Sequence, residues 1–200
     1  EAASYQLQKK WYKKYADGYR HHKQYIRAEE MYEMTLADFN FDKDAGLTYA
    51  DMELNDLANY GKAEKLLKRF VLDHHPDDQD AILALGDTYL EWGTEKEPEQ
   101  LKNAYERYSY AIHRFGENNR NLAGMMKYFV RTDNLREVLK IKPRFMNDPS
   151  SLSSVEWSEM GGFLLDKLYG PLPPSDEFMR GRIEDMKTVL KNAIDRDSSN

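Results

Sequence analysis

The chain has 200 residues and no cysteine, and its 29 Lys and Arg residues against 35 Asp and Glu residues give a formal net charge of −6. The acidic balance argues against nucleic-acid binding, which depends on neutralising phosphates. The absence of cysteine excludes disulfides, thiol nucleophiles and cysteine-ligated zinc. No apolar run approaches the ~20 residues of a membrane span, so we expect no direct membrane insertion.

Composition also indicates the fold class. The sequence is rich in Tyr, Lys, Glu and Asp and has no long Val/Ile runs, which favours helices over a sheet. We therefore predict an all-α fold. The chain begins Glu1-Ala2-Ala3-Ser4 without an initiator Met, so we expect a fragment or processed product of a longer protein.

The first predicted element is a helix hairpin over residues 9–42, whose two helices meet near His21 to Lys23. Small residues, Ala16 and Ala28, let two antiparallel helices approach closely, while large ones fill the space between them. The large residues expected to pack in this way are Tyr12, Tyr15, Tyr19 and Tyr32.

A second hairpin is expected over 44–77, with its turn at Tyr60-Gly61 and its end at Pro76. A third is expected over 79–118, with a longer polar connection at 94–99 that contains Pro98.

A fourth hairpin is expected over 119–152, with its turn at 132–134 and a kink or a helix end near Ile141 because of Pro143. A fifth is expected over 154–200, with Ser154 as N-cap and a Pro-rich insertion at 169–175. Its second helix would present Met186, Leu190 and Ala193.

The large/small spacing recurs most clearly at 12–40 and 82–116, and in weaker form in the other three segments. It resembles the tetratricopeptide repeat (TPR) family. The resemblance implies a right-handed α-solenoid of about five antiparallel helix hairpins, with a concave peptide-binding face, that acts as an assembly scaffold. The Tyr-rich, cysteine-free array with long insertions is also similar to the TPR region of spirochaete periplasmic flagellar collar proteins, which implies a bacterial periplasmic location and a part in motility. The cytoplasm is the alternative location, because cysteine-free proteins occur in both compartments.

In the TPR family, the first helix of each hairpin lines the groove. Carried onto this sequence, that register gives a partner-binding groove. The groove would be basic at its N-terminal end, apolar to acidic in the middle and basic again at its other end. Such a groove suits an acidic or amphipathic segment. The groove residues are Lys10, Lys13, Lys14, Asp17, Arg20, His21, Tyr49, Met52, Asn55, Leu83, Asp87, Glu91, Lys127 and Arg131. The alternative is that these side chains are only solvated helix faces.

Residues 40–51 resemble a calcium-binding EF-hand loop. Oxygen ligands stand at Asn40, Asp42, Asp44 and Asp51, but Ala45 replaces the glycine of the sharp turn and Asp51 is shorter than the usual closing glutamate. The same segment is the connection between the first two hairpins, where Asp and Asn serve as caps. We expect no metal and no cofactor, and keep this loop as a minor alternative.

Three functional hypotheses follow. The first is a non-enzymatic scaffold that assembles a multiprotein complex, with other proteins or self-association as its partners. The second is a regulatory peptide- or chaperone-type TPR module that holds one short acidic or amphipathic client segment. The third is a helical accessory domain of a larger enzyme.

Overall fold

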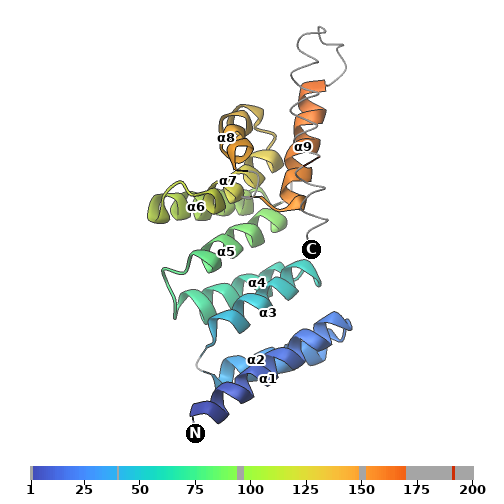
Figure 1. Cartoon of the computed structure of the whole chain (residues 1–200), viewed down its shortest axis with the longest axis vertical. Coiled ribbons are helices and arrows are strands. Elements are labelled where there is room, and N and C mark those ends of the chain that lie inside the picture. Colours follow the sequence, from blue (N-terminus) through green and yellow to red (C-terminus); the bar gives the residue numbers. More distant parts are fainter. Residues whose placement is uncertain (1, 40, 94–96, 149–151, 170–190, 192–200) are drawn as a thin grey trace. The chain divides into compact units, whose positions relative to one another are not determined.

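The computed structural model describes residues 2–39, 41–93, 97–148, 152–169 and 191. Within these ranges the protein is all-α, with consecutive helices packed antiparallel and no strand (Figure 1). The chain divides into two compact units, Glu1–Arg107 and Tyr108–Asn200, which are described separately. None of the helices described is long and apolar enough to cross a membrane.

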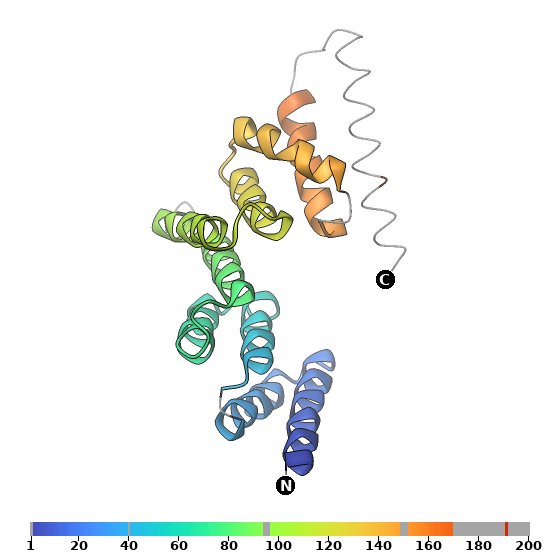
Figure 2. The same ribbon diagram turned by 60° about the vertical axis from the view of Figure 1, so that its left-hand side comes forward.

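The first hairpin of unit 1 consists of α1 (Ala2–His21) and α2 (Tyr25–Asp38), which lie side by side (Figure 2). Lys23, with φ of 56°, reverses the chain between them. Ala16, Ala28 and Tyr32 are fully buried, as predicted for the crossing of the two helices. The prediction is wrong for Tyr15, which is 54% exposed.

The second hairpin pairs α3 (Lys43–Asn55) with α4 (Tyr60–Lys65), which continues as a π-helix, η1 (Leu66–Leu72). Gly46 permits the close approach of α3 to η1, because a Cβ atom there would lie 2.7 Å from the Val71 side chain. Ala50 and Ala63 are buried, as the small-residue pattern predicts.

The predicted turn at Tyr60-Gly61 is wrong by several residues. The turn occupies 56–59, where Ala58 takes a φ of 50° and the Asn59 amide donates to the Glu53 carbonyl at 2.7 Å. This left-handed residue lets α4 begin already at Tyr60, whose ring stacks on Trp92.

Unit 1 continues with α5 (Gln79–Trp92), and α6 (Pro98–Phe115) crosses the unit boundary. The Asp78 side chain caps α5 by accepting from the Ala81 amide at 2.9 Å. Pro98 opens α6, as expected of a proline at the first helical position. Residues 94–96 of the predicted connection lie outside the described ranges.

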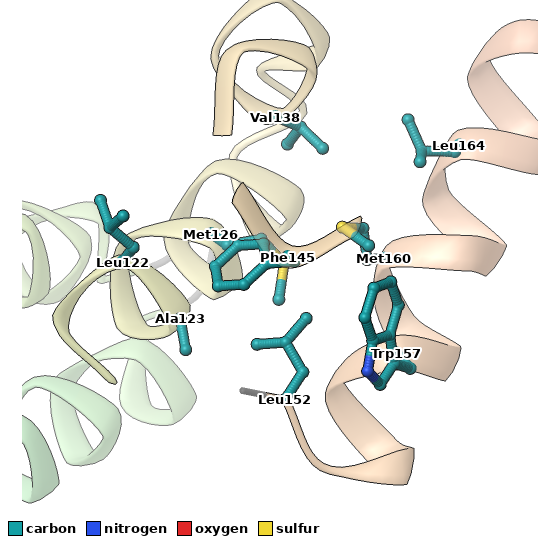
Figure 3. Packing of buried hydrophobic residues seen from close by; sticks show 9 residues of the cluster. All are labelled: Leu122, Ala123, Met126, Val138, Phe145, Leu152, Trp157, Met160 and Leu164. Carbon is teal, nitrogen blue, oxygen red and sulfur yellow. The ribbon is translucent and has the colours of Figure 1, made fainter. Parts of the chain in front are cut away.

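Unit 2 contains α7 (Asn119–Arg131), α8 (Leu135–Asn147) and α9 (Ser154–Tyr169), and α7 packs against both of the others. The predicted turn at 132–134 is confirmed. Trp157, Phe145 and Met126 meet at the centre of its core (Figure 3). The buried cluster comprises Leu122, Ala123, Met126, Val138, Phe145, Leu152, Trp157, Met160 and Leu164.

The predicted helix end near Ile141 is wrong, because α8 continues through Pro143 to Asn147. The alternative, a kink at Pro143, stays a prediction. The proline is exposed, and the fully buried Phe145 two residues later anchors the last turn in the core. Core packing therefore outweighs the one backbone hydrogen bond that the proline removes.

The predicted N-cap of α9 is displaced by one residue. Ser153, not Ser154, forms the cap, since its Oγ accepts from the Glu156 amide at 3.3 Å while the Glu156 carboxylate accepts from the Ser153 amide at 2.8 Å. The predicted second helix of the last hairpin, with Met186, Leu190 and Ala193, lies outside the described residues, as does the insertion after Tyr169.

Candidate functional site

The outer face of α1 carries three large apolar side chains at a spacing of four residues. Leu7, Trp11 and Tyr15 are 56%, 45% and 54% exposed. The rings of Trp11 and Tyr15 stack with centroids 5.9 Å apart, and Lys14 Nζ lies 5.3 Å from the Trp11 ring. With the exposed Lys10, they form what we call the aromatic–basic patch: Leu7, Lys10, Trp11, Lys14 and Tyr15.

Two of the groove residues predicted from the sequence, Lys10 and Lys14, belong to this patch. Trp11 and Tyr15 were missed, because the repeat pattern assigned aromatic residues of α1 to helix packing. The recurrence of Leu7, Trp11 and Tyr15 every four residues is the signal that could have found them, since it places all three on one helix face.

The other α1 residues that were predicted for the groove lie outside the aromatic–basic patch. Lys13 is half-buried, and His21 is exposed with its ring against that of His22. Asp17 accepts a hydrogen bond from the buried Tyr32 hydroxyl at 2.7 Å. Asp17 therefore joins α1 to α2, although its own side chain is exposed.

Arg20 joins α1 to α3 through two carboxylates. Its Nε donates to Asp56 at 2.5 Å and its Nη2 to Asp51 at 2.7 Å, and the side chain of Asn55 donates to Asp51. Burial alone lowers the pKa of Arg20, but the hydrogen bonds and charges of these two aspartates raise it above its usual value. Arg20 is thus tied into the fold rather than offered to a ligand.

Tyr49 and Met52, also predicted for the groove, are fully buried and do not lie on an open helix face. Tyr49 stacks on Tyr32 with ring centroids 5.3 Å apart, and its hydroxyl donates to Glu33 at 3.0 Å. The repeat register of this hairpin could not show that these two residues of α3 lie in the core.

The predicted groove residues of later helices lie in both units. On α5 in unit 1, Leu83 and Asp87 are half-buried and Glu91 is exposed. On α7 in unit 2, Lys127 is half-buried and Arg131 is exposed.

The segment that resembles a calcium loop forms a helix from Lys43 onward. Asp42 caps this helix by accepting from the Ala45 amide and pairs with Lys9, Asp44 is exposed in its first turn, and Asp51 binds Arg20. Asn40 lies outside the described residues. In the part of the chain that the structure describes, no three His, Asp or Glu side chains converge to hold a metal ion.

A buried polar network lies between α2, α3 and α4. Lys62 Nζ is 2.9 Å from the fully buried Glu53 carboxylate and 3.0 Å from that of Glu29, and it lies 5.0 Å from the centre of the Tyr49 ring. Burial raises the pKa of Glu53 above its usual value, and the neighbouring Glu29 acts in the same direction. The one ammonium group thus pairs with two carboxylates, one from α2 and one from α3.

Beside this network a cavity of about 830 Å³ opens between α2, α3 and the α4–η1 segment. Its size falls within the range of ligand-binding pockets, and most of its lining surface is apolar although half of the lining residues are charged. The lining residues are Glu33, Leu36, Ala37, Phe41, Tyr49, Lys62, Glu64, Lys65, Leu66, Lys68, Arg69 and Phe70.

In comparisons with known proteins, no protein-family model and no curated protein matches this chain.

Proposed function

We propose that the protein is a non-enzymatic scaffold that assembles a multiprotein complex, built from TPR-like helix hairpins that stack into a right-handed α-solenoid. The antiparallel pairs α1/α2, α3/α4–η1 and α7/α8 support this proposal. So do the buried alanines at the crossings of the first two pairs, which match the small-residue positions of the TPR pattern.

The aromatic–basic patch on α1 is the observation that carries the proposal. Exposed Trp and Tyr side chains on a rigid helix supply a large contact area at little entropic cost, and residues of these types dominate the binding energy of protein interfaces. Lys10 and Lys14 beside the rings favour a partner surface that carries carboxylates. The expected partner is therefore an acidic, amphipathic protein segment.

The resemblance to spirochaete periplasmic flagellar collar proteins makes a bacterial periplasmic motor complex the setting that we propose for this scaffold. A regulatory module that binds one peptide is the second candidate. The cavity beside η1 favours it, because a pocket with a mostly apolar lining surface suits one short peptide segment.

Affinity capture from the source organism tests the first proposal. The variant Lys10→Glu/Lys14→Glu reverses two patch charges and leaves Arg20, which holds α1 to α3, in place. The matched control, Lys102→Glu/Lys140→Glu, makes the same change in net charge at two exposed lysines on other helices. A defined set of partners that is lost from the patch variant and kept by the control supports the scaffold. Identical partner sets for both variants would overturn the assignment to α1.

A further inference from the structure

The cavity beside η1 has an aromatic wall and an aliphatic floor. Leu36 and Leu66, 3% and 4% exposed, form the floor, and the half-buried rings of Phe41 and Phe70 lie with centroids 5.7 Å apart. Phe41 is fixed on its other side by stacking on His74 at 4.1 Å. The cavity beside these rings has a mostly apolar lining surface and is large enough to receive one large side chain.

The π-helical geometry of η1 contributes to this space. A π-helix is wider than an α-helix, and short π segments occur frequently at functional sites. The segment Leu66–Leu72 contributes Leu66, Lys68, Arg69 and Phe70 to the lining. The departure from α geometry thus coincides with the cavity wall.

The cations of the lining are of two kinds. Lys62 is held by Glu29 and Glu53, and Lys68 by Glu64. Lys65 and Arg69 are exposed, four residues apart on one helix face, and no carboxylate of the described residues lies within ion-pair distance of either. Two positive charges therefore stand unpaired at the rim next to the aromatic wall.

The acidic residues of the lining offset these two charges only in part, since Glu64 interacts electrostatically with Lys65. Glu64 accepts from Lys68 Nζ and from the Tyr89 hydroxyl, both at 2.7 Å. Glu33 accepts from the Tyr49 hydroxyl and lies on α2, while Lys65 and Arg69 lie on the α4–η1 segment. The charge left for a ligand on that segment is positive, so the complementary ligand is acidic.

We propose that this cavity binds a segment of a partner protein in which one large apolar side chain is flanked by carboxylates. The apolar side chain packs against the rings of Phe41 and Phe70, and the carboxylates pair with Lys65 and Arg69. The inference goes beyond the patch on α1, because it assigns a second site that other elements, α2, α3 and the α4–η1 segment, line. It rests on the proposed function only in taking the ligand to be a protein segment.

A selection from a phage library of random 12-residue peptides tests the proposal. The immobilised native chain is the bait, and soluble Ala37→Trp protein is present in excess as a competitor. Ala37 is exposed and lines the cavity, so this variant fills the cavity while keeping the α1 patch. Peptides that bind elsewhere are removed by the competitor. The expected consensus places Phe, Trp or Leu next to Asp or Glu.

The selected peptide is then synthesised and its dissociation constant measured against two charge variants. Lys65→Glu/Arg69→Glu should weaken binding at least about tenfold, while Lys10→Glu/Lys14→Glu, with the same change in net charge, should leave it within about twofold. Methyl resonances of Leu36 and Leu66 should shift on binding.

A basic or uncharged consensus, no enrichment over the competitor, or equal effects of the two charge variants would overturn the proposal. The result is independent of the capture experiment, because the cavity variants leave α1 unchanged. If the affinity capture fails and the peptide selection succeeds, only the assignment of protein binding to α1 is refuted. If the capture succeeds and the selection fails, only the cavity proposal is refuted.

Discussion

Lys62 Nζ lies 2.9 Å from the carboxylate of Glu53, a side chain with no exposed surface. The contact joins α4 to α3 and brings in Glu29 from α2. Three helices are thus held by one ammonium group. Removing one partner of a buried ion pair leaves an uncompensated charge, which is more harmful than replacing both.

The variant Lys62→Met should therefore destabilise unit 1 markedly. We expect a loss of about 2–3 kcal/mol in the free energy of unfolding, below the range for fully buried pairs because the Lys62 side chain is 30% exposed. Urea unfolding followed by circular dichroism measures it. The control is Lys68→Met, which breaks the exposed pair with Glu64 and should change stability by less than about 1 kcal/mol. Equal losses would contradict a structural role for the Lys62 network.

Glu53 predicts a pH dependence of stability. Its pKa is raised in the folded state from the ordinary value of 4.5, so the folded state binds the proton more tightly than the unfolded state. The free energy of unfolding should therefore fall as the pH rises from 4.5 through the folded-state pKa. Glu53→Gln, which cannot titrate, should lack this decline when urea unfolding is measured across the pH series.

Glu64 provides a control, because its folded-state pKa is shifted in the direction opposite to that of Glu53. Although burial raises its pKa, the hydrogen bonds from Lys68 and Tyr89 lower it overall. Its contribution is present above the unfolded-state pKa and is lost as the pH falls through the lower folded-state value. Glu64→Gln should therefore alter the acid side of the stability curve only. A Glu53→Gln curve parallel to that of the native chain would refute the role assigned to Glu53.

Two helical glycines of unit 2 make a matched pair. A Cβ atom on Gly124 would lie 2.5 Å from the ring of the fully buried Tyr108, whereas one on Gly162 would meet no atom within 4 Å. Gly124→Ala should cost about 1–3 kcal/mol through overpacking. Gly162→Ala should add about 0.5–1 kcal/mol, because alanine is the better helix former. Thermal unfolding of the two variants distinguishes them. A stable Gly124→Ala variant would contradict the packing of α7 against Tyr108 of α6, and a destabilised Gly162→Ala variant would contradict the open space at Gly162.

Pro143 offers a stabilising substitution. The residue is exposed inside α8, where it removes a backbone hydrogen bond without filling the core. Pro143→Ala should raise the free energy of unfolding by about 1–3 kcal/mol, measured by chemical denaturation. A loss of stability would show that the proline ring itself supports unit 2.

The sequence predicted the helical class and most of the turns because these depend on local signals. Ala16 and Ala28 mark the first helix crossing, and Pro98 marks the start of α6. The turn before α4 was missed because it depends on Ala58 adopting a left-handed conformation, for which alanine carries no sequence signal.

The candidate site was predictable only in part. The place of Lys10 and Lys14 in the site could be predicted from the helix face on which they lie. The burial of Tyr49 and the attachment of Arg20 to α3 depend on tertiary packing. The cavity beside η1 depends on a π-helix within a hairpin whose sequence reads as ordinary helix. Local pattern cannot reveal such a departure, because it results from how Leu66, Phe70 and their neighbours pack.

Site-specific photo-cross-linking in the source organism tests the central claim most directly. A photoreactive phenylalanine analogue replaces Trp11 in one variant, Tyr15 in a second and Ile26, which is 75% exposed near the start of α2, in a third. Protein binding at the aromatic–basic patch predicts the same cross-linked partner protein from positions 11 and 15 and none from position 26. Cross-linking from position 26 alone, or equally from all three, would contradict the assignment of protein binding to the aromatic–basic patch of α1.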